Sequence, residues 1–280
     1  LFGGAFTAHA SYEALLADPT VDAVYVPLPN ALHCEWAIRA MQNGKHVLCE
    51  KSITLNAAEL DEAVELAREH QVVLAEAQTI YHMPIYQKLS GLAAAGAFGP
   101  LRTIQLNFGS YKPYDMTNRF FNRQLAGGAM LDIGVYALSF VRWFMSSCPA
   151  EILSQVKFAA TGVDEQAGIL LKNKEEEMAT VLLSLHAKQP KRGTISFDRA
   201  YIELFEYPRG DKAIITWTGD GRREEISAGD ASNALVYEIR DMEQAVAGDP
   251  AVMHLDYTVD VMRMMTAIRQ QWHMKYPEEE

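Results

Sequence analysis

The sequence is poor in cysteine and in long apolar runs, and each shortage excludes a class of protein. Its three cysteines, Cys34, Cys49 and Cys148, are odd in number, lack CxxC spacing and sit among apolar neighbours. This pattern is typical of buried, reduced thiols, so we expect a reducing compartment and a cytoplasmic protein. No apolar run approaches the ~18–20 residues that a membrane-spanning helix requires, so we expect no membrane association.

Positive charge is also scarce, with 25 Lys and Arg against 36 Asp and Glu and a net charge of -11. The one short basic patch, Lys188, Lys191 and Arg192, is too small to offset the repulsion of phosphate backbones, so we expect no nucleic-acid partner. The sequence contains no HExxH, no zinc-type Cys/His spacing, no GxxxxGK[ST] and no GxSxG. We therefore expect no metal site. A composition of 49% hydrophobic and 22% charged residues indicates a soluble globular protein.

The first hundred residues alternate between strand and helix patterns. The predicted strands are Val21–Leu28, His46–Cys49 and Val72–Ala75. Asn30 is expected to cap the helix after the first strand, and Asn56 with Glu59 forms a capping box for the next helix. Strands joined by short links and helices are parallel. This region is therefore predicted to be part of a doubly wound α/β sheet.

After Gly99-Pro100 the pattern changes to strands separated by turns. Leu101–Phe108 is a predicted strand, and Ala129–Met145 a predicted helix. Seven further strands between 152 and 226 are spaced as antiparallel hairpins, and two helices follow. We predict two domains, 1–100 and 101–280, of which the second is α+β. The acidic residues Glu278–Glu280 are expected to be solvated.

Ligands of open parallel sheets bind beyond the carboxyl ends of the strands, which selects the segments Pro29–His33 and Glu50-Lys51. A lysine directly after a buried strand lies near apolar groups, which lower the pKa of an ammonium and suit it to proton transfer. The alternative is a surface Lys51 paired with Glu50 or with another nearby carboxylate. For His33, an ordinary polar residue of a first helical turn is the favoured alternative.

A third candidate lies in the segment GGAMLDIGVY, residues 127–136. Asp132 and Tyr136 are four residues apart and share one face of a helix. They are either a capping aspartate with a core tyrosine, or a proton-handling pair that the neighbouring glycines allow a ligand to approach.

Together these segments are much more specific than any one of them. The run VDAVYVPLPNALHCEWAIRAMQNGKHVLCEKS and the later GGAMLDIGVYAL resemble the glucose–fructose oxidoreductase/inositol dehydrogenase (Gfo/Idh/MocA) family, nearest to its dihydrodiol dehydrogenase and sugar-oxidoreductase branch. The resemblance implies a Rossmann doubly wound parallel sheet, followed by an α+β domain with a large, open, mostly antiparallel sheet. It also implies a homodimer or homotetramer formed through that sheet.

The implied activity is NAD- or NADP-dependent oxidation or reduction of a hydroxyl or carbonyl carbon on a sugar, polyol or cyclic diol. Residue by residue, the resemblance assigns catalytic roles to Lys51, Asp132 and Tyr136, places Pro29, Asn30, His33, Glu50 and Lys51 at the cofactor, and offers Phe120 and Arg123 as weaker substrate contacts.

Two features depart from the family pattern. Ser52 stands where the family has a proline after the lysine, so Lys51 is expected to point differently or to move more. The family's first strand, glycine-rich turn, helix and second strand do not precede Leu1, and no GxGxxG occurs in the chain. We therefore expect the chain to lack roughly its first fifty residues, at ~25–30 residues per βα repeat, and with them the choice between NAD and NADP.

These departures support an alternative function, a sugar-binding or regulatory homologue of the same fold that has lost cofactor binding. The presence of Lys51, Asp132 and Tyr136 together opposes it, because a protein that only binds a sugar has no need for that set.

Overall fold

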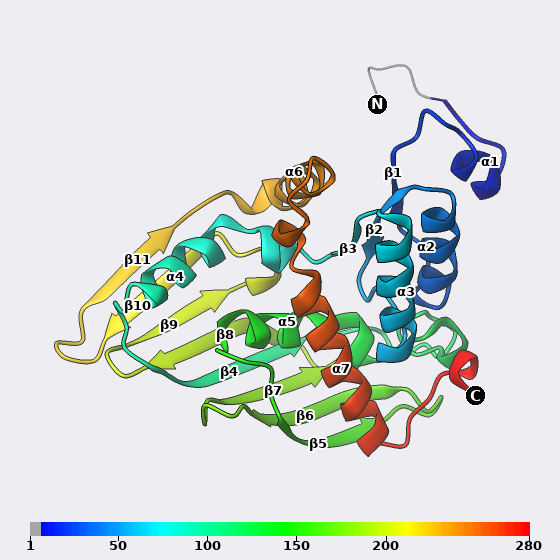
Figure 1. The fold of residues 1–280 in the computed structure, drawn as a ribbon. Coiled ribbons are helices and arrows are strands. Elements are labelled where there is room, and N and C mark those ends of the chain that lie inside the picture. The colour runs from blue at the N-terminus through cyan, green and yellow to red at the C-terminus, as the bar shows by residue number, and fades with distance from the viewer. Residues whose placement is uncertain (1–6) are drawn as a thin grey trace.

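Three short parallel strands organise the N-terminal part of the chain. The computed structural model describes residues 7–280, and its first sheet has the order β1-β2-β3 with both pairings parallel. The strands are β1 (Ala23–Val26), β2 (His46–Glu50) and β3 (Leu74–Ala77), and the helices are α1 (Tyr12–Leu16), α2 (His33–Gln42) and α3 (Ala57–His70). The predicted parallel α/β unit is confirmed (Figure 1).

At the start of α3 the Asn56 cap is confirmed, but the reciprocal bond of the predicted capping box goes to Leu55 instead of Asn56; at the start of α2 the prediction fails. Asn56 accepts a hydrogen bond from the Glu59 N–H at 3.0 Å, and the Glu59 carboxylate accepts one from the Leu55 N–H at 2.9 Å. The expectation that Asn30 caps α2 is wrong. The chain first makes one 3₁₀ turn over Asn30–Leu32, so α2 begins at His33 without a side-chain cap. The Asn30 amide is thereby left out of the helix.

The second sheet has eight strands in the order β11-β10-β9-β8-β4-β7-β6-β5. Its strands are β4 (Leu101–Gly109), β5 (Glu151–Phe158), β6 (Asp164–Lys172), β7 (Met178–Ser184), β8 (Gln189–Phe197), β9 (Ala200–Phe205), β10 (Lys212–Trp217) and β11 (Arg223–Ser227). All neighbours are antiparallel except β4 and β7, which run parallel. The predicted large, mostly antiparallel sheet is confirmed.

Four helices complete this half of the molecule, and one of them connects it to the first sheet (Figure 1). They are α4 (Pro84–Ala94), α5 (Val135–Phe144), α6 (Ala234–Val246) and α7 (Leu255–Gln271). The long helix α7 contacts α5 and β5 on one side and α3 and β3 on the other. Thr266 on α7 accepts from the Ala57 N–H at 2.9 Å, so α7 holds the first turn of α3 in place.

The two faces of the large sheet differ in exposure. On the face toward α5, Ile104, Val181 and Ile195 are buried in the core. On the opposite face large apolar side chains reach solvent, among them Leu153 and Leu182, which are 67% and 51% exposed. The surface of a monomeric soluble protein rarely carries a large contiguous patch of exposed apolar side chains. The sheet therefore has one covered face and one open face.

One stretch of the described chain, Arg123–Phe144, is long and apolar enough to cross a membrane by length and composition. However, 78% of its most apolar window is buried inside the fold. Its apolar side chains are therefore explained by the core that α5 forms with the large sheet.

Candidate functional site

The segment after β2 meets the start of the α5 helix at the carboxyl end of the first sheet. Lys51 Nζ lies 2.7 Å from the Asp132 carbonyl oxygen and 3.3 Å from its Oδ1. The same Nζ lies 5.1 Å from the centre of the Tyr136 ring. The structure therefore brings together the three residues that the resemblance assigned to catalysis. The Lys51–Ser52 peptide bond is cis, and the Ser52 hydroxyl donates to the Leu131 carbonyl at 3.1 Å.

Asp132 lies in a π-helical turn, Met130–Gly134, that leads directly into α5. The turn is held at its first residue, where the Met130 N–H donates to Asp164 Oδ2 at 2.6 Å. Gly128 is required just before it, because its φ is +123° and a Cβ there would lie 2.1 Å from Asp164 Oδ1. Single π turns within helices are frequent at functional sites. Here the turn places Asp132 and Tyr136 on the same wall of a cleft.

The catalytic candidates line a cavity of about 530 Å³. Its other walls carry four basic side chains, one acidic side chain that pairs with Lys191 at 3.0 Å, and two aromatic rings, namely Lys112, Arg119, Lys191, Arg209, Glu206, Phe108 and Phe120. Ammonium and guanidinium groups are hydrogen-bond donors without acceptor capacity. The cavity therefore suits a ligand rich in oxygen acceptors, which a sugar or a polyol is.

A second cavity, of about 290 Å³, opens at the carboxyl end of β1 and shares Arg119, Phe120 and Asp132 with the first. Pro29 and Asn30 line it, opposite the turn at Gly127 and Gly128. The apolar side chains of this cavity and the Asn30 amide suit a flat ring that carries an amide group. The cavity also lies beyond the carboxyl end of a parallel strand, which is where dinucleotides bind in such sheets. These residues fit the nicotinamide end of NAD or NADP.

The remaining cofactor candidates lie behind this wall. Glu50 accepts a hydrogen bond from the Tyr25 hydroxyl and one from the Lys51 N–H at 3.2 Å. His33 is fully buried, and its two ring nitrogens lie 2.7 Å from the Ser52 carbonyl oxygen and 2.6 Å from the Leu28 carbonyl oxygen. His33 therefore connects the loop after β1 to the loop after β2, and its ring has no nitrogen left for a ligand.

Two buried carboxyl groups behind the cleft were not found from the sequence. Burial, and after it the nearby Glu50 carboxylate, raises the pKa of Glu238, on α6, to about 8. Burial likewise raises the pKa of Glu76, at the end of the first sheet, to about 7. Burial and then Glu50 raise the pKa of Tyr136 well above its usual value. Tyr136 is therefore protonated at neutral pH.

The loop before Gly127 positions its side chains differently from the prediction. Phe120 lines both cavities, and the Arg119 guanidinium lies 4.1 Å from the centre of its ring and 3.6 Å from Asp132 Oδ1. Arg123 points away from both cavities and donates to the Lys275 carbonyl at 2.6 Å. Arg119 thus occupies the place expected for Arg123. Only its position beside Phe120 could have indicated this.

Among the residues that the structure describes, no group of three His, Cys, Asp or Glu side chains is arranged to hold a metal ion.

Two family models match the chain, in the order that the fold suggests. Residues 4–78 match the oxidoreductase family with the NAD-binding Rossmann fold, and residues 86–203 match the Gfo/Idh/MocA C-terminal domain. The D-xylose 1-dehydrogenase (NADP(+)) 2 of Haloferax volcanii is 30% identical over 266 residues, which are 94% of this chain and 81% of that protein. The chain belongs to the Gfo/Idh/MocA family of oxidoreductases.

Other relatives of this family are similarly close. The trans-1,2-dihydrobenzene-1,2-diol dehydrogenase of Xenopus laevis is 32% identical over 209 residues, 74% of this chain. The chain spans 63% of that protein's length and 59% of its Xenopus tropicalis counterpart. The 3-ketoreductase of Actinomadura kijaniata, solved with NADP and TDP-benzene, shares the fold with a TM-score of 0.82 at 24% identity, over 93% of this chain and 81% of that one. These relatives are thus a diol dehydrogenase, an NADP(+)-dependent xylose dehydrogenase and a 3-ketoreductase solved with NADP.

Proposed function

We propose that this protein is an NAD(P)-dependent oxidoreductase that interconverts a hydroxyl and a carbonyl group on a sugar, a polyol or a cyclic diol. The observation that carries the proposal is the meeting of Lys51, Asp132 and Tyr136 on one wall of the cleft. They come from two parts of the chain that match the family's nucleotide-binding and C-terminal domains. No purely structural role requires an ammonium, a carboxylate and a phenol at one cavity.

The roles of these residues follow from their surroundings. When bound, the nicotinamide exchanges a hydride with the substrate carbon that carries the oxygen. Lys51 has two N–H groups directed at Asp132, and its third is available to hold that oxygen. Tyr136 is protonated at neutral pH, which is the form that donates a proton to a carbonyl oxygen during reduction. Asp132 holds Lys51 in place and balances its charge.

Two residues of the second cavity, Pro29 and Asn30, would flank the nicotinamide. Glu50 lines neither cavity, so its place would be behind the cofactor, where it accepts bonds from the Tyr25 hydroxyl and the Lys51 N–H. His33 acts one layer behind them, because it joins the backbone of the loops that carry Pro29 and Lys51. Phe120 and Arg119 would close over the substrate from the opposite side.

The test is a titration of the purified protein with NADH and NADPH, followed by nicotinamide fluorescence. A screen of sugars, polyols and cyclic diols follows, with reduction or oxidation of the nucleotide measured by absorbance at each. We expect saturable binding of one or both nucleotides and turnover of at least one compound class. If neither nucleotide binds, the oxidoreductase proposal is wrong, and a sugar-binding homologue becomes the leading account.

We propose in addition that two copies associate through the open face of the large sheet. Leu153 and Leu182 are exposed there, and Tyr201 and Phe205 on β9 point to the same side. We expect light scattering at micromolar concentration to give at least twice the 31.2 kDa of one chain. Leu182→Arg should lower that mass. A wild-type mass near 31.2 kDa contradicts the proposal.

We further propose a cytoplasmic location. All three cysteines are free thiols, and burial raises the pKa of Cys34 to about 12. Such thiols are unreactive and suit a reducing compartment. Localisation of a tagged protein by cell fractionation tests this, and recovery from an oxidising compartment would contradict it.

A further inference from the structure

The acidic residues at 278–280 are not simply solvated, and one of them belongs to the interior. The Arg269 guanidinium, on α7, forms two parallel contacts with the Glu279 carboxylate, at 2.6 and 2.9 Å. The side chains of Arg269 and Glu279 are only 3% and 11% exposed. Burial raises the pKa of Glu279, but the bonds from Arg269 and from the Tyr276 N–H outweigh it and leave the pKa below its usual value. The expectation of a solvated tail is therefore wrong for Glu279.

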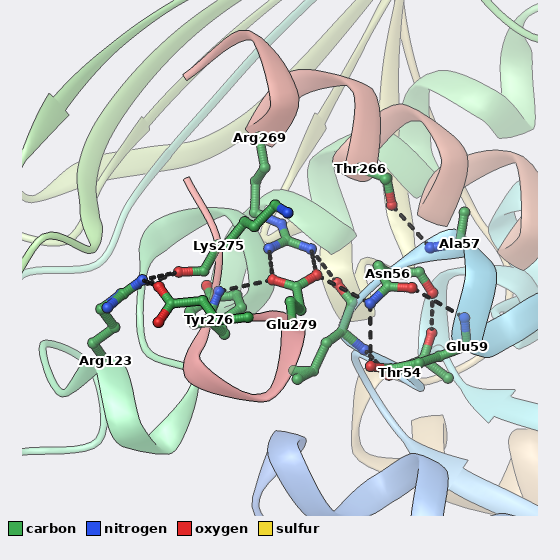
Figure 2. A network of polar contacts seen from close by, with 12 residues as sticks. Thr54, Asn56, Ala57, Glu59, Arg123, Thr266, Arg269, Lys275, Tyr276 and Glu279 are labelled. Atoms are coloured by element: carbon green, nitrogen blue, oxygen red, sulfur yellow. Dashed lines mark hydrogen bonds and ion pairs between the residues drawn. The ribbon is translucent and has the colours of Figure 1, made fainter. Parts of the chain in front are cut away.

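Glu279 and its partners connect three parts of the chain that are distant in sequence. The Asn56 amide donates to Glu279 Oε1 at 3.0 Å, and Arg269 also donates to the Leu55 carbonyl. The Tyr276 hydroxyl donates to the Gly127 carbonyl at 2.7 Å. Figure 2 shows the contacts of Arg269, Asn56 and Glu279 as one network between α7, the start of α3 and residues 275–279. We call Arg269, Tyr276, Glu279 and Asn56 the clasp.

Both ends of the clasp lie next to the catalytic candidates. Leu55 and Asn56 end the loop that begins with Lys51, and Gly127 precedes the turn that carries Asp132. Within that span, two further links join the two segments on the cleft side: the contacts from Lys51 to Asp132 and the bond from the Ser52 hydroxyl to the Leu131 carbonyl. The clasp therefore fixes the distance between these two segments from the side opposite the cleft.

The charge of Glu279 is what holds the clasp together. Arg269 Nε has no hydrogen-bond partner within the described part of the chain, so Glu279 supplies most of the acceptors for this buried cation. A buried charge without an opposite charge beside it is strongly destabilising, which favours a rearrangement toward another carboxylate. Without Glu279, the nearby carboxyl of Asp164 would attract Arg269, and Asp164 also holds the Met130 N–H at the start of the Asp132 turn. Loss of one carboxylate would thus disturb both segments.

We infer that Glu279 is a positioning residue for the proposed reaction, which holds Lys51 and Asp132 in register by joining Arg269, Asn56 and Tyr276 outside the cleft. This inference rests on the proposed function. It assigns a role to a side chain that touches neither cavity. Glu279 should affect turnover through Lys51, and it should leave the binding of the nucleotide largely unchanged.

The test compares Glu279→Gln with Glu278→Gln, a matched control at an exposed neighbour. Tyr276→Phe is the second variant, because it removes only the hydroxyl that bonds Gly127. We expect Glu279→Gln to lower kcat about tenfold and Tyr276→Phe about threefold, with nucleotide Kd within about twofold of wild type. Glu278→Gln should match wild type in both. Thermal melting checks that each variant is folded at the assay temperature.

Two further measurements separate positioning from general loosening. In a double-mutant cycle with Lys51→Met, removal of Glu279 should cost less than about twofold, because the group it positions is absent. Amide hydrogen exchange, which needs no substrate, should accelerate in residues 51–56 and 127–132 of Glu279→Gln and not in Glu278→Gln. Wild-type turnover in both Glu279→Gln and Tyr276→Phe, or an equal cost of Glu279→Gln with and without Lys51, would overturn the inference. Absence of turnover in the wild type itself would instead refute the proposed function.

Discussion

Several contacts join the loop after β2 to the C-terminal half of the chain, and two of them differ in kind: the cleft contact between Lys51 and Asp132 and the clasp around Glu279. In the cleft, Lys51 uses two of its three N–H groups, and its partner carboxylate is shared with Arg119. In the clasp, both oxygens of Glu279 accept bonds from Arg269 and from further donors. In the cleft, Lys51 therefore has a donor left for a ligand, whereas in the clasp both Glu279 oxygens are already bonded within the protein.

The largest expected effect comes from breaking the cleft contact. Lys51→Met should lower kcat/KM about a thousandfold, as expected for the loss of a group that orients an oxygen and its proton. The free energy of unfolding should fall by less than on breaking the clasp, because the Lys51 and Asp132 side chains are 15% and 14% exposed and Arg119 stays beside Asp132. Steady-state kinetics and urea unfolding measure the two quantities. Lys174→Met, at a lysine whose side chain is 76% exposed, is the control, and equal activity in both variants would contradict the assignment.

Breaking the clasp should lower the free energy of unfolding more than breaking the cleft contact does. Arg269→Met leaves the Glu279 carboxylate without its main partner, and such a loss from a buried pair costs about 3–5 kcal/mol. Urea unfolding at pH 7 measures this cost. Arg263→Met is the matched control on the same helix, because its pair with Asp61 is exposed. Similar losses in the two variants would show that the clasp is no more important for stability than a surface pair.

The buried carboxyl groups behind the cleft should make the stability of the folded protein depend on pH. The folded protein keeps a proton on Glu238 up to about pH 8, while the unfolded chain loses it near its ordinary pKa of 4.5. Folding therefore binds a proton in this window, so stability falls as pH rises from 4.5 to 8 and is level above that. Glu238→Gln should remove about 3–4 kcal/mol of this fall between pH 5 and pH 8, at about 1.36 kcal/mol per pKa unit, measured by urea unfolding at pH 5, 6.5 and 8. An unchanged slope would contradict the protonated state of Glu238.

The smallest expected effect concerns the second cation of the cleft. Arg119 lies 3.6 Å from Asp132 Oδ1 and is largely exposed, so it contributes to substrate binding more than to turnover. Arg119→Met should raise KM for the substrate about fivefold and change kcat less than twofold. Arg102→Met, on the distant exposed pair with Asp198, should change neither constant. A fall in kcat with unchanged KM would instead place Arg119 in the chemical step.

Most of the fold could be predicted because its signals are local. The apolar strands β1 and β2, the Asn56 cap and the alternating strands of the large sheet each depend on neighbouring residues. The third strand begins later than predicted, because Gln71 takes a left-handed conformation and the chain needs Val72 and Val73 to re-enter the sheet. The predicted boundary near residue 100 stays a prediction. The bond from the Tyr86 hydroxyl to the Tyr207 carbonyl favours placing α4 with the large sheet.

Only those residues of the site that stand in contiguous sequence motifs could be predicted from the sequence. Lys51, Asp132 and Tyr136 stand in two contiguous segments, and the structure brings these segments together. Arg123 lies in the predicted loop, but its partner is the Lys275 carbonyl, which no local pattern connects to it. The position of the Glu279 side chain is likewise set by its bonds from Arg269 and Asn56. Contacts between residues that are distant in sequence decide such side chains, and a single sequence does not contain that information.

The position of β4 in the large sheet has a consequence for how the chain folds. On one side of β4 lie β8, β9, β10 and β11, and on the other lie β7, β6 and β5, each group formed by hairpins of neighbours in sequence. Only β4 connects the two groups. It leaves the ribosome before either of its partners, with both edges unpaired. Until β7 and β8 emerge, β4 is therefore the segment of this sheet most exposed to wrong pairing in a nascent chain.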